Sequence, residues 1–461
     1  MISTETIVAI ATSQTISAIA IIRVSGNDAF TICNTIFKHY KIENFVIANA
    51  NSHKAYFGNI VDGNEIIDEV LLTIFKAPNS FTGENTVEIS CHGSVYIQQK
   101  IVQLILHNGA KSAIAGEFTM RAFKNGRMDL SQAEAVADLI ASENLAMHKI
   151  AINQLKGNIS IELNNLRQKL IDFASLLELE LDFAEEDVEF ANRKELKKLL
   201  VEIGEKVTKM SDTFSLGNSI KKGVPIVIAG KPNVGKSTLL NTLLQEEKAI
   251  VSEIAGTTRD TIEDTFNING IAFRLTDTAG IRSTTDIIES IGISKTFEKI
   301  EQSALLLYVL DAINFEESDI ETVLQNEKIN TKKILFILNK TDMKPIENIV
   351  NILNQKHLNF VAISAKNNIG IEELKLKLVE LSGIEQLQQH QIIITNIRHF
   401  EALKSTALHI EMALQNIAIN VSSDFLAQDI RIALMHLGSI TGTVSSDDLL
   451  GNIFSKFCIG K

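Results

Sequence analysis

The sequence predicts a multidomain fold: an α+β N-terminal domain, followed by a discontinuous α-helical domain with an α/β domain inserted into it. Three observations support this prediction. Short β-rich runs separated by turns fill the first part of the chain, apolar residues then recur at helical spacing, and strand-like runs alternate with helical stretches before helical spacing returns. We place the domain boundaries at residues 1–120, 121–221, 222–383 and 384–461.

The first domain combines several strands with one helix. Turn sequences such as Asp62-Gly63-Asn64 separate its β-rich runs, and the apolar pattern of Ala29–Phe37 predicts a helix between them. A mixture of this kind, without regular alternation, indicates an α+β domain. The predicted strands are Thr6–Ala11, Ala18–Val24, Glu69–Phe75 and Thr86–Ile89.

The helical domain is predicted from apolar residues that recur every three or four positions. Ser131 and Glu134 form a capping-box pattern at the start of one helix. A second helical segment covers about residues 193–214, and helical spacing returns after Asn396 and again over Leu426–Leu437. The stripe of one long predicted helix consists of Leu155, Ile159, Leu163, Leu166, Leu170, Phe173, Leu177 and Leu181.

The middle domain alternates strand-like runs with helical stretches. Such alternation predicts a parallel sheet covered by helices on both faces. Because helical segments flank this domain on both sides in the sequence, we expect it to be inserted into the helical domain. The predicted strands are Pro225–Ala229, Ile271–Thr276, Ala304–Leu310, Lys333–Leu338 and Phe360–Ile363.

Length and composition indicate a large globular protein. The chain has 461 residues, of which 45% are hydrophobic, enough for several cores. Its 44 basic and 56 acidic residues give a net charge of -12, so it carries no electrostatic sign of a general nucleic-acid binder. Any contact with RNA must therefore be local or shared with a partner.

The cysteines and the apolar runs indicate a cytoplasmic location. Cys33, Cys91 and Cys458 are widely spaced and odd in number, which argues against a disulfide framework and against a zinc site. The apolar run Ile16–Ile22 has no basic segment before it and ends at Arg23, so we interpret it as a strand and not as a signal peptide. No stretch approaches the ~20 apolar residues of a membrane span, and we expect no membrane association.

A phosphate-binding loop opens the middle domain. Gly230–Ser237 (GKPNVGKS) matches G-x-x-x-x-G-K-[ST], after an apolar strand and before the predicted helix Thr238–Leu244. The glycines allow backbone N–H groups to surround phosphate oxygens at a helix N-terminus. Lys236 offers a positive charge to the outer phosphates and Ser237 offers a hydroxyl to Mg²⁺.

Three further motifs follow in an order typical of guanine-nucleotide-binding proteins. In Asp277–Gly280 (DTAG), Asp277 can hold Mg²⁺ through its water shell, and Gly280 can donate a backbone N–H to the γ-phosphate. Asn339–Asp342 (NKTD) ends with a carboxylate that can accept two hydrogen bonds from guanine, and Ser364–Lys366 (SAK) completes the base pocket. With the preceding loop, they predict an α/β P-loop GTPase domain that binds GTP and GDP.

The residues expected at the catalytic step differ from those of Ras. Ras-like enzymes orient the attacking water with a Gln after the last glycine of D-x-x-G, whereas Ile281 follows here. Another group must therefore position the water. In the loop Gly256–Asp260, Thr258 is a candidate second hydroxyl for Mg²⁺, and Arg259 is either a stabilising cation or a solvated surface residue.

Together with these motifs, residues outside the middle domain resemble the MnmE (also called TrmE) family of bacterial tRNA-modification GTPases. The resemblance covers essentially the whole chain, in the family's order. It departs at Ser13–Ser17, where the family usually has a glycine-rich loop. The matching segments are Asn233 with Gly256–Asp260, Ser80–Glu84, Gly116–Thr119, Arg121–Phe123, Met128–Ala135, Ile440–Gly442 and Phe457–Lys461.

The resemblance implies a specific reaction. Such proteins act with the FAD-containing partner MnmG, as a heterotetramer, to add a carboxymethylaminomethyl-type group at C5 of the wobble uridine of certain tRNAs. A homodimer formed by the N-terminal domain binds a tetrahydrofolate derivative, 5-formyl- or 5,10-methylene-tetrahydrofolate, which supplies the one-carbon unit. The matching positions for the folate are Arg23, Glu88, Arg127 and Lys461.

The resemblance also implies that GTP hydrolysis requires K⁺ and pairing of two such domains. Asn233 would contribute a side-chain oxygen to K⁺, while Ser252, Ile254 and Thr257 would contribute loop oxygens, and Glu289 would position the water. The residues assigned to the nucleotide are Asn233, Val234, Gly235, Lys236, Ser237, Thr238, Ser252, Glu253, Ile254, Ala255, Gly256, Thr257, Thr258, Asp277, Thr278, Ala279, Gly280, Asn339, Lys340, Thr341, Asp342, Ser364, Ala365 and Lys366.

Cys458 is the third candidate catalytic residue, beside Glu289 and Arg259. If the last helices return to the N-terminal domain, Cys458 lies near the folate and can act there as a nucleophile or a proton donor. Two other functions remain open at this point. One is a ribosome-assembly GTPase of the Era or Der type, and the other is a folate-binding scaffold whose GTPase domain is only structural.

Overall fold

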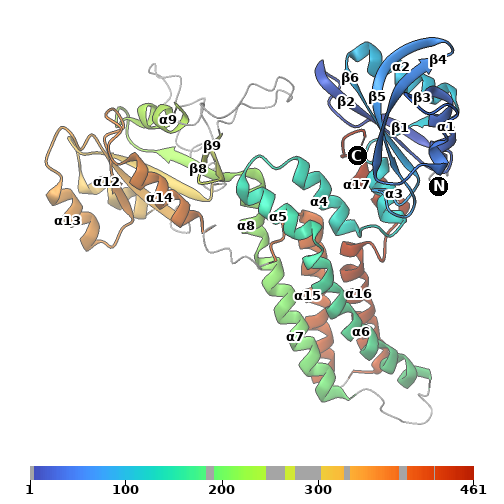
Figure 1. The fold of residues 1–461 in the computed structure, drawn as a ribbon. Helices are drawn as coiled ribbons and strands as arrows, with labels where there is room; N and C mark the ends of the chain where they lie inside the picture. The colour runs from blue at the N-terminus through green and yellow to red at the C-terminus, as the bar shows by residue number, and fades with distance from the viewer. Residues whose placement is uncertain are drawn as a thin grey trace. The chain divides into compact units, whose positions relative to one another are not determined.

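The computed structural model describes residues 5–182, 192–245, 265–275, 303–325, 333–383, 392–419 and 421–460. The chain forms two compact units, and each is built from separate segments of the sequence (Figure 1). The first comprises Met1–Ile140, Ile152–Leu199 and Met412–Lys461, and the second comprises Ala141–Ala151 and Leu200–Glu411. The four predicted domain boundaries remain a prediction.

The first unit contains a seven-stranded sheet in the order β3-β4-β5-β6-β2-β1-β7. All neighbouring strands are antiparallel except β1 and β7, which run parallel. Helices α1 (Ala29–Ile36) and α2 (Val95–His107) pack against the sheet, and their apolar side chains share one core with it. The strands are β1 (Ile7–Ile10), β2 (Ser17–Ser25), β3 (Phe37–His39), β4 (Lys54–Asp62), β5 (Glu65–Phe75), β6 (Thr86–Gly93) and β7 (Lys111–Ser112), and a short 3-10 helix covers Ile47–Asn49.

The α+β prediction for this region is confirmed, with three strands missed, β3, β4 and β7. β4 was not predicted, although it pairs with β5 along most of its length. The predicted helix ends one residue early, because Phe37 is extended and begins β3. The run Ile16–Ile22 forms most of β2, as its interpretation as a strand requires.

Five helices complete the described part of the first unit. The predicted capping box at Ser131 is wrong, because the helix begins one residue earlier and Ser131 is fully buried. Asp129 and Gln132 form the box instead: each side chain accepts a hydrogen bond from the backbone N–H of the other, at 2.9 and 3.0 Å. The helices are α3 (Glu117–Lys124), α4 (Leu130–Ile140), α6 (Asn158–Asp182), α16 (Ser423–Thr441) and α17 (Asp447–Phe454).

Helix α6 packs lengthwise against α16, from the far end of the sequence. Five residues of the predicted stripe, from Ile159 to Leu177, are buried, whereas Phe173 is only half-buried. Leu155 belongs to the preceding helix α5 (Leu145–Leu155). The break lies at Gly157, whose φ of +81° is left-handed and ends α5. At the other end of the pair, Ser423 Oγ donates to Glu180 Oε2 at 3.1 Å.

The second unit is built on a six-stranded sheet in the order β13-β12-β11-β8-β10-β9. Its strands are parallel except for the antiparallel pair β9 and β10. The five predicted strands are all confirmed, and β9 was missed. The strands are β8 (Val224–Ala229), β9 (Thr265–Ile268), β10 (Ile271–Leu275), β11 (Leu305–Asp311), β12 (Lys333–Asn339) and β13 (Phe360–Ala362).

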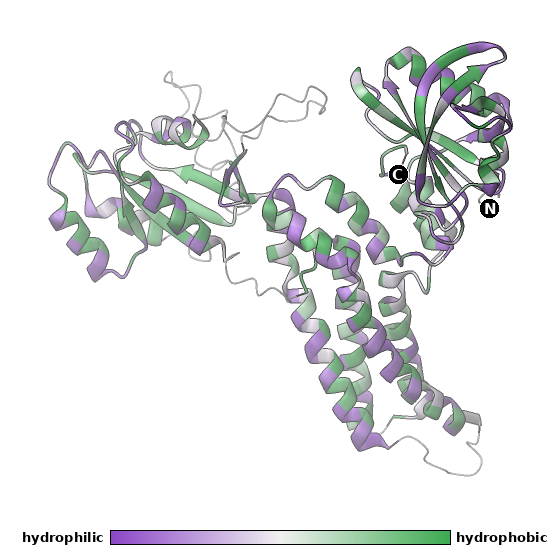
Figure 2. Ribbon diagram, viewed as in Figure 1, coloured by the Kyte–Doolittle hydropathy of each residue, from purple (hydrophilic) through white to green (hydrophobic). Residues whose placement is uncertain are grey.

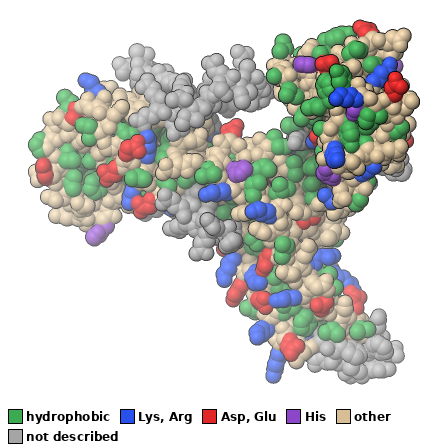
Figure 3. All heavy atoms as spheres, viewed as in Figure 1, with side chains coloured by type: hydrophobic (Ala, Val, Ile, Leu, Met, Phe, Trp, Pro, Cys, Tyr) green, Lys and Arg blue, Asp and Glu red, His purple; other side chains and the backbone are tan. Residues whose placement is uncertain are grey.

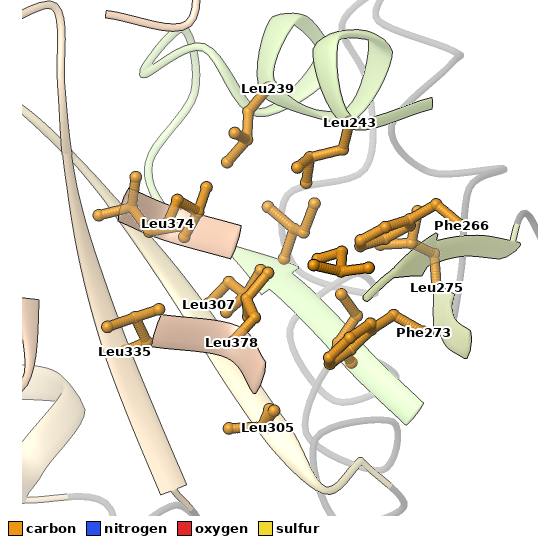
Figure 4. Packing of buried hydrophobic residues seen from close by; sticks show 14 of the residues in the cluster. Leu239, Leu243, Phe266, Phe273, Leu275, Leu305, Leu307, Leu335, Leu374 and Leu378 are labelled. Carbon is orange, nitrogen blue, oxygen red and sulfur yellow. The ribbon is translucent and has the colours of Figure 1, made fainter. Parts of the chain in front are cut away.

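Helices cover both faces of this sheet, as the sequence predicted. On one face, α9 (Lys236–Gln245) and α14 (Ile371–Ser382) close a large apolar core, and Figure 4 shows Leu239 and Leu243 of α9 pointing into it. On the other face, α12 (Glu317–Leu324) and α13 (Glu347–Gln355) cover a second cluster. Figure 2 shows these strands as predominantly hydrophobic, which is typical of parallel strands buried on both faces.

The remaining helices of the second unit flank the sheet domain in the sequence. Phe214 and Phe400 stack with their ring centroids 4.4 Å apart, and Thr213 Oγ1 accepts a hydrogen bond from the N–H of Ile394. Segments before and after the sheet domain therefore pack together, as an inserted domain requires. The helices of these segments are α8 (Phe214–Lys222) and those parts of α7 (Arg193–Asp212) and α15 (Ile397–Ala418) that fall within Leu200–Glu411. Within the described residues, every helix is too short or too polar to cross a membrane.

Candidate functional site

The phosphate-binding loop lies at the carboxyl end of β8, where only glycine fits at two positions. Gly230 and Gly235 have φ values of +146° and +97°. A Cβ on Gly230 would lie 2.4 Å from the carbonyl oxygen of Val309, and one on Gly235 would lie 2.3 Å from Nδ2 of Asn339. The neighbouring strand and the NKTD motif thus approach the loop so closely that a side chain at either glycine position is excluded.

Lys236 is the cation of the loop and begins α9. Its Nζ donates to the carbonyl oxygens of Gly230 at 2.8 Å and Lys231 at 2.7 Å. Burial lowers the pKa of Lys236, since desolvation disfavours the charged ammonium. A partly desolvated cation at the N-terminus of a helix is well suited to an anion such as a phosphate. The loop residues therefore fit a nucleotide.

Asn339 joins three of the predicted motifs. Its Nδ2 donates to the carbonyl oxygen of Val234 in the phosphate loop at 2.8 Å, and its Oδ1 accepts the N–H of Ala365 at 3.1 Å. Asn339 is only 3% exposed, so these two bonds satisfy a buried amide. The structure thus brings the GKPNVGKS, NKTD and SAK segments to one edge of the sheet, at the carboxyl ends of β8, β12 and β13.

The residue after Asn339 makes a second connection to the phosphate loop. Lys340 Nζ donates to the carbonyl oxygen of Asn233 at 2.8 Å and to Oδ2 of Asp311 at 2.8 Å. Asn233 and Lys340 are both left-handed, with φ values of 62° and 65°. Asp311 ends β11, and sequence reasoning missed it because nothing near it in the sequence resembles a nucleotide motif.

The expected guanine-reading carboxylate also has a partner that the sequence did not reveal. Asp342 Oδ2 accepts a hydrogen bond from Nδ2 of Asn367 at 3.0 Å. Ser364 pairs with Ile369 in an isolated bridge, so the turn that carries Asn367 folds back beside the SAK residues. The contact orients the Asp342 carboxylate at the rim of the same edge. Lys366 lies exposed next to it, and Thr341 donates its N–H to the carbonyl oxygen of Ile363.

Several predicted site residues lie outside the described residues, so the expected magnesium and potassium sites are described only at Ser237 and Asn233. Arg259, Glu289 and the D-x-x-G motif are among those outside. The full set is Ser252, Glu253, Ile254, Ala255, Gly256, Thr257, Thr258, Arg259, Asp277, Thr278, Ala279, Gly280, Glu289 and Lys461.

A second candidate site lies on the sheet of the first unit. Arg23 of β2 stands opposite Glu88 of β6, and its Nε donates to Oε1 of Glu88 at 2.8 Å. The guanidinium also lies over the rings of Phe81 and Phe118, 5.4 and 5.6 Å from their centroids. A flat cation between two aromatic rings, beside a carboxylate, forms a surface suited to a planar heterocycle with donor and acceptor groups.

The tail of the chain lies beside Arg23. Nη1 of Arg23 donates to the carbonyl oxygen of Gly460 at 3.4 Å, and the N–H of Gly116 donates to the carbonyl oxygen of Cys458 at 3.4 Å. Gly460 has a φ of +94°, and a Cβ there would lie 2.4 Å from the carbonyl oxygen of Ile10. Backbone contacts therefore hold the tail in place, while the Cys458 side chain stays exposed.

A buried ionic network connects the segments that form this surface. Arg121, only 3% exposed, pairs with Glu84 at 3.2 Å and with Glu117 at 2.8 Å. Ser25 Oγ donates to Glu84 at 2.7 Å, which connects the network to the strand that carries Arg23. The network thereby positions the segments that carry Phe81 and Phe118. The sequence showed these residues as family motifs but gave none of them a role. Arg127, the third predicted folate contact, is exposed, with Cγ beside Gly83.

We expect Cys458 to be the only one of the chain's three thiols that reacts rapidly with a thiol reagent at pH 8. Burial raises the pKa of Cys33 to about 12, and burial together with the nearby Asp68 charge raises the pKa of Cys91 to about 11. At pH 8 the thiolate fraction of Cys91 is then roughly one in a thousand, and that of Cys33 is lower still. A colorimetric thiol titration of the native protein checks this.

Cys458→Ser should abolish the fast phase, and unfolding in denaturant should release all three thiols. A second fast thiol in the native protein, or a fast phase that survives the substitution, would contradict the prediction.

Two family models match the chain. The model for the GTP-binding protein TrmE N-terminus matches residues 6–127, and the model for the MnmE helical domain matches residues 130–458. A tRNA modification GTPase MnmE from Flavobacterium johnsoniae is 51% identical over 468 residues, with 100% of both chains covered. One from Flavobacterium psychrophilum is 52% identical over 465 residues, also with 100% of both covered.

Among solved structures, the FeoB G-domain from Methanococcus jannaschii is 26% identical. The match covers 34% of this chain and 97% of that one, with a TM-score of 0.26. A score this low adds nothing to the fold described above.

Proposed function

Because this chain belongs to the MnmE family of tRNA modification GTPases, we propose that it hydrolyses GTP in the course of tRNA modification. The observation that carries the proposal is the junction at Asn339, whose amide bonds the phosphate loop on one side and the SAK segment on the other. This junction supports a single nucleotide site that extends from the phosphates to the guanine base. The fold is multidomain, with an α/β P-loop domain of the GTPase kind.

Each candidate site residue has its own role in binding or hydrolysing GTP. Backbone N–H groups of Gly230–Ser237 and the ammonium of Lys236 would face the phosphates, and the Asp342 carboxylate would accept hydrogen bonds from guanine. Ser237, with Thr258 and Asp277, would hold Mg²⁺, which would supply positive charge beside the phosphates. Asn233 contributes a side-chain oxygen to K⁺, together with Ser252, Ile254 and Thr257, when two such domains pair. Glu289 orients the attacking water, and Arg259 stabilises charge.

The first unit carries the modification site in this proposal. Arg23, Glu88, Arg127 and Lys461 hold a tetrahydrofolate derivative, and the ion pair between Arg23 and Glu88 supports this assignment. The folate supplies the one-carbon unit. The homodimer acts with an MnmG-like FAD protein, as a heterotetramer, to place a carboxymethylaminomethyl-type group at C5 of the wobble uridine. Cys458 acts as nucleophile or proton donor, and its position on a tail held beside Arg23 is consistent with this role.

The charges on the surface favour a shared tRNA contact. On the face drawn in Figure 3, acidic and basic side chains are interspersed over the described residues and do not gather in one basic patch. The net charge of -12 points the same way. We therefore propose that the partner protein contributes part of the surface that binds the tRNA, and that the complex works in the cytoplasm.

A ribosome-assembly GTPase of the Era or Der type is not favoured. Family membership over the whole chain argues against it, as does the docking of the tail beside Arg23. A folate-binding scaffold with a merely structural GTPase domain is not favoured either, because Lys236 and Asn339 keep an arrangement suited to nucleotide binding.

We expect GTP turnover to be stimulated at least about tenfold when KCl replaces NaCl, because a monovalent cation of the right size takes the role of an arginine finger. The measurement is phosphate release by the full chain at constant ionic strength, with oligomeric state followed in parallel by light scattering. RbCl, whose cation is similar in size to K⁺, serves as a positive control. Equal rates in KCl and NaCl would contradict the K⁺-dependent mechanism.

A further inference from the structure

Asp311 is a carboxylate that stands behind the phosphate loop without reaching the nucleotide positions. It ends β11, between β8 and β12, and is 9% exposed. Its Oδ2 lies 2.8 Å from Nζ of Lys340, and the same Nζ donates to the carbonyl oxygen of Asn233 at 2.8 Å. Asp311, Lys340 and Asn233 thus form a three-residue strut from the sheet to the loop.

The carboxylate is held firmly in its orientation. Oδ1 accepts the N–H of Ile313 at 2.8 Å, and Oδ2 accepts a longer hydrogen bond from Nδ2 of Asn314 at 3.4 Å. Burial raises the pKa of Asp311, but the hydrogen bonds from Lys340 and Ile313 outweigh it, so the pKa lies below its ordinary value. Asp311 is therefore ionised at neutral pH, and the strut ends in a fixed negative charge.

The strut supports a backbone that is unfavourable by itself. Asn233 and Lys340 both have positive φ, at 62° and 65°, and neither is glycine. Such conformations persist only where surrounding contacts hold them. For Asn233 the described contact is the bond from Lys340, whereas the next residue, Val234, is held separately by Asn339. The position of Asn233 can thus change while the rest of the loop keeps its anchor.

We propose that Asp311 is a positioning residue for the monovalent cation, acting through Lys340 on the backbone of Asn233. This inference rests on the proposed function, in which the Asn233 side chain contributes an oxygen to K⁺. A side-chain oxygen can meet a cation only if its backbone is held in one orientation, which the strut provides. Loss of the Asp311 charge weakens the hold of the sheet on Lys340 and loosens Asn233, while Asn339 continues to anchor Val234 and Lys236 keeps its place in the loop.

The test is Asp311→Asn in the full chain. We expect the KCl concentration for half-maximal GTP turnover to rise about tenfold, since a hydrogen bond between two charged groups is replaced by a weaker one to a neutral amide. The Kd for a fluorescent GTP analogue, measured in NaCl, should change by less than about threefold, because the anchor at Val234 remains. A purely structural residue would move both quantities together.

Asp319→Asn is the matched control. Asp319 pairs with Lys231 of the same loop at 2.6 Å, so the substitution also removes a carboxylate that braces the loop, but not through Asn233. Its half-saturating KCl concentration should stay within about twofold of the wild type. Asp311→Glu keeps the charge, so its half-saturating KCl concentration should lie between those of the wild type and Asp311→Asn. If melting curves show that Asp311→Asn does not fold, Asp311→Glu is used for the test instead.

Hydrogen–deuterium exchange of the peptide covering residues 231–235 gives a readout that does not depend on turnover. If this peptide exchanges faster in Asp311→Asn than in either the wild type or Asp319→Asn, the result supports the strut. If its exchange in Asp311→Asn equals that of the wild type, the strut is overturned. An unchanged requirement for KCl, or a parallel loss of nucleotide and KCl affinity, also overturns the inference. If KCl fails to stimulate the wild type, the proposed K⁺ dependence fails, and the exchange experiment alone then decides whether Asp311 positions Asn233.

Discussion

Cys458→Ser is expected to abolish tRNA modification while GTP turnover stays within about twofold of the wild type, because the thiol serves only the chemistry beside Arg23. The tail is held by the carbonyl oxygens of Cys458 and Gly460, and Gly460 also needs its positive φ. None of these contacts uses the cysteine side chain. The substitution should therefore leave the tail in place and remove only the reactive sulfur.

The measurement combines phosphate release with mass spectrometry of the wobble uridines from a deletion strain that expresses the variant. Ser455→Ala is a suitable control, because Ser455 is exposed, lies three residues earlier and bonds only its own helix. Equal loss of both activities in Cys458→Ser would refute the separation of roles, and full modification would show that the thiol is dispensable.

Gly235→Ala is expected to weaken GTP binding by more than about a hundredfold, corresponding to about 3 kcal/mol or more. Left-handed φ is costly for alanine, and the new Cβ would lie 2.3 Å from Nδ2 of Asn339. Asn339 would have to move, which breaks its buried hydrogen bonds to Val234 and Ala365. The loop and the base pocket would then lose their common anchor.

Gly109→Ala separates the clash from the conformational strain. Gly109 has a similar φ of +106°, but a Cβ there meets nothing within 4 Å. It should therefore lower the melting temperature slightly and leave GTP affinity unchanged. The measurement is titration with a fluorescent GTP analogue, with circular dichroism to confirm folding. Binding by Gly235→Ala within about threefold of the wild type would contradict this account of the loop.

The parts of the fold that could be predicted were those that leave a pattern among residues close together in the sequence. Continuous apolar runs identified the buried strands of the second sheet, whereas β4 and β9 went unrecognised. β4 mixes exposed and buried residues irregularly, and β9 is only four residues long. The capping box at Ser131 failed because Asp129 and Gln132 offered a competing box two residues earlier, and only burial of Ser131 decides between them.

The residues of the candidate sites also fall into two groups, those that a local pattern predicted and those that it did not. The nucleotide motifs could be found because each is a short segment with its own residue pattern. Asp311 and Asn367 could not, because their roles arise from partners distant in the sequence, Lys340 for Asp311 and Asp342 for Asn367. Arg121 was found within a family segment, but its pairing with Glu84 was not. A lone acidic or amide residue in a sequence carries no sign of such a partner.

The pairing of α6 with α16 has a consequence for how the protein is made. Glu180 and Ser423, which bond across this pair, are 243 residues apart. At a synthesis rate of about 5–20 residues per second, α16 is synthesised on the order of tens of seconds after α6. During this time the apolar stripe of α6 is not yet covered by α16. Meanwhile the parallel sheet of the second unit can fold together with the helices that cover its two faces. Nascent chains that stall before α16 should therefore bind chaperones through α6.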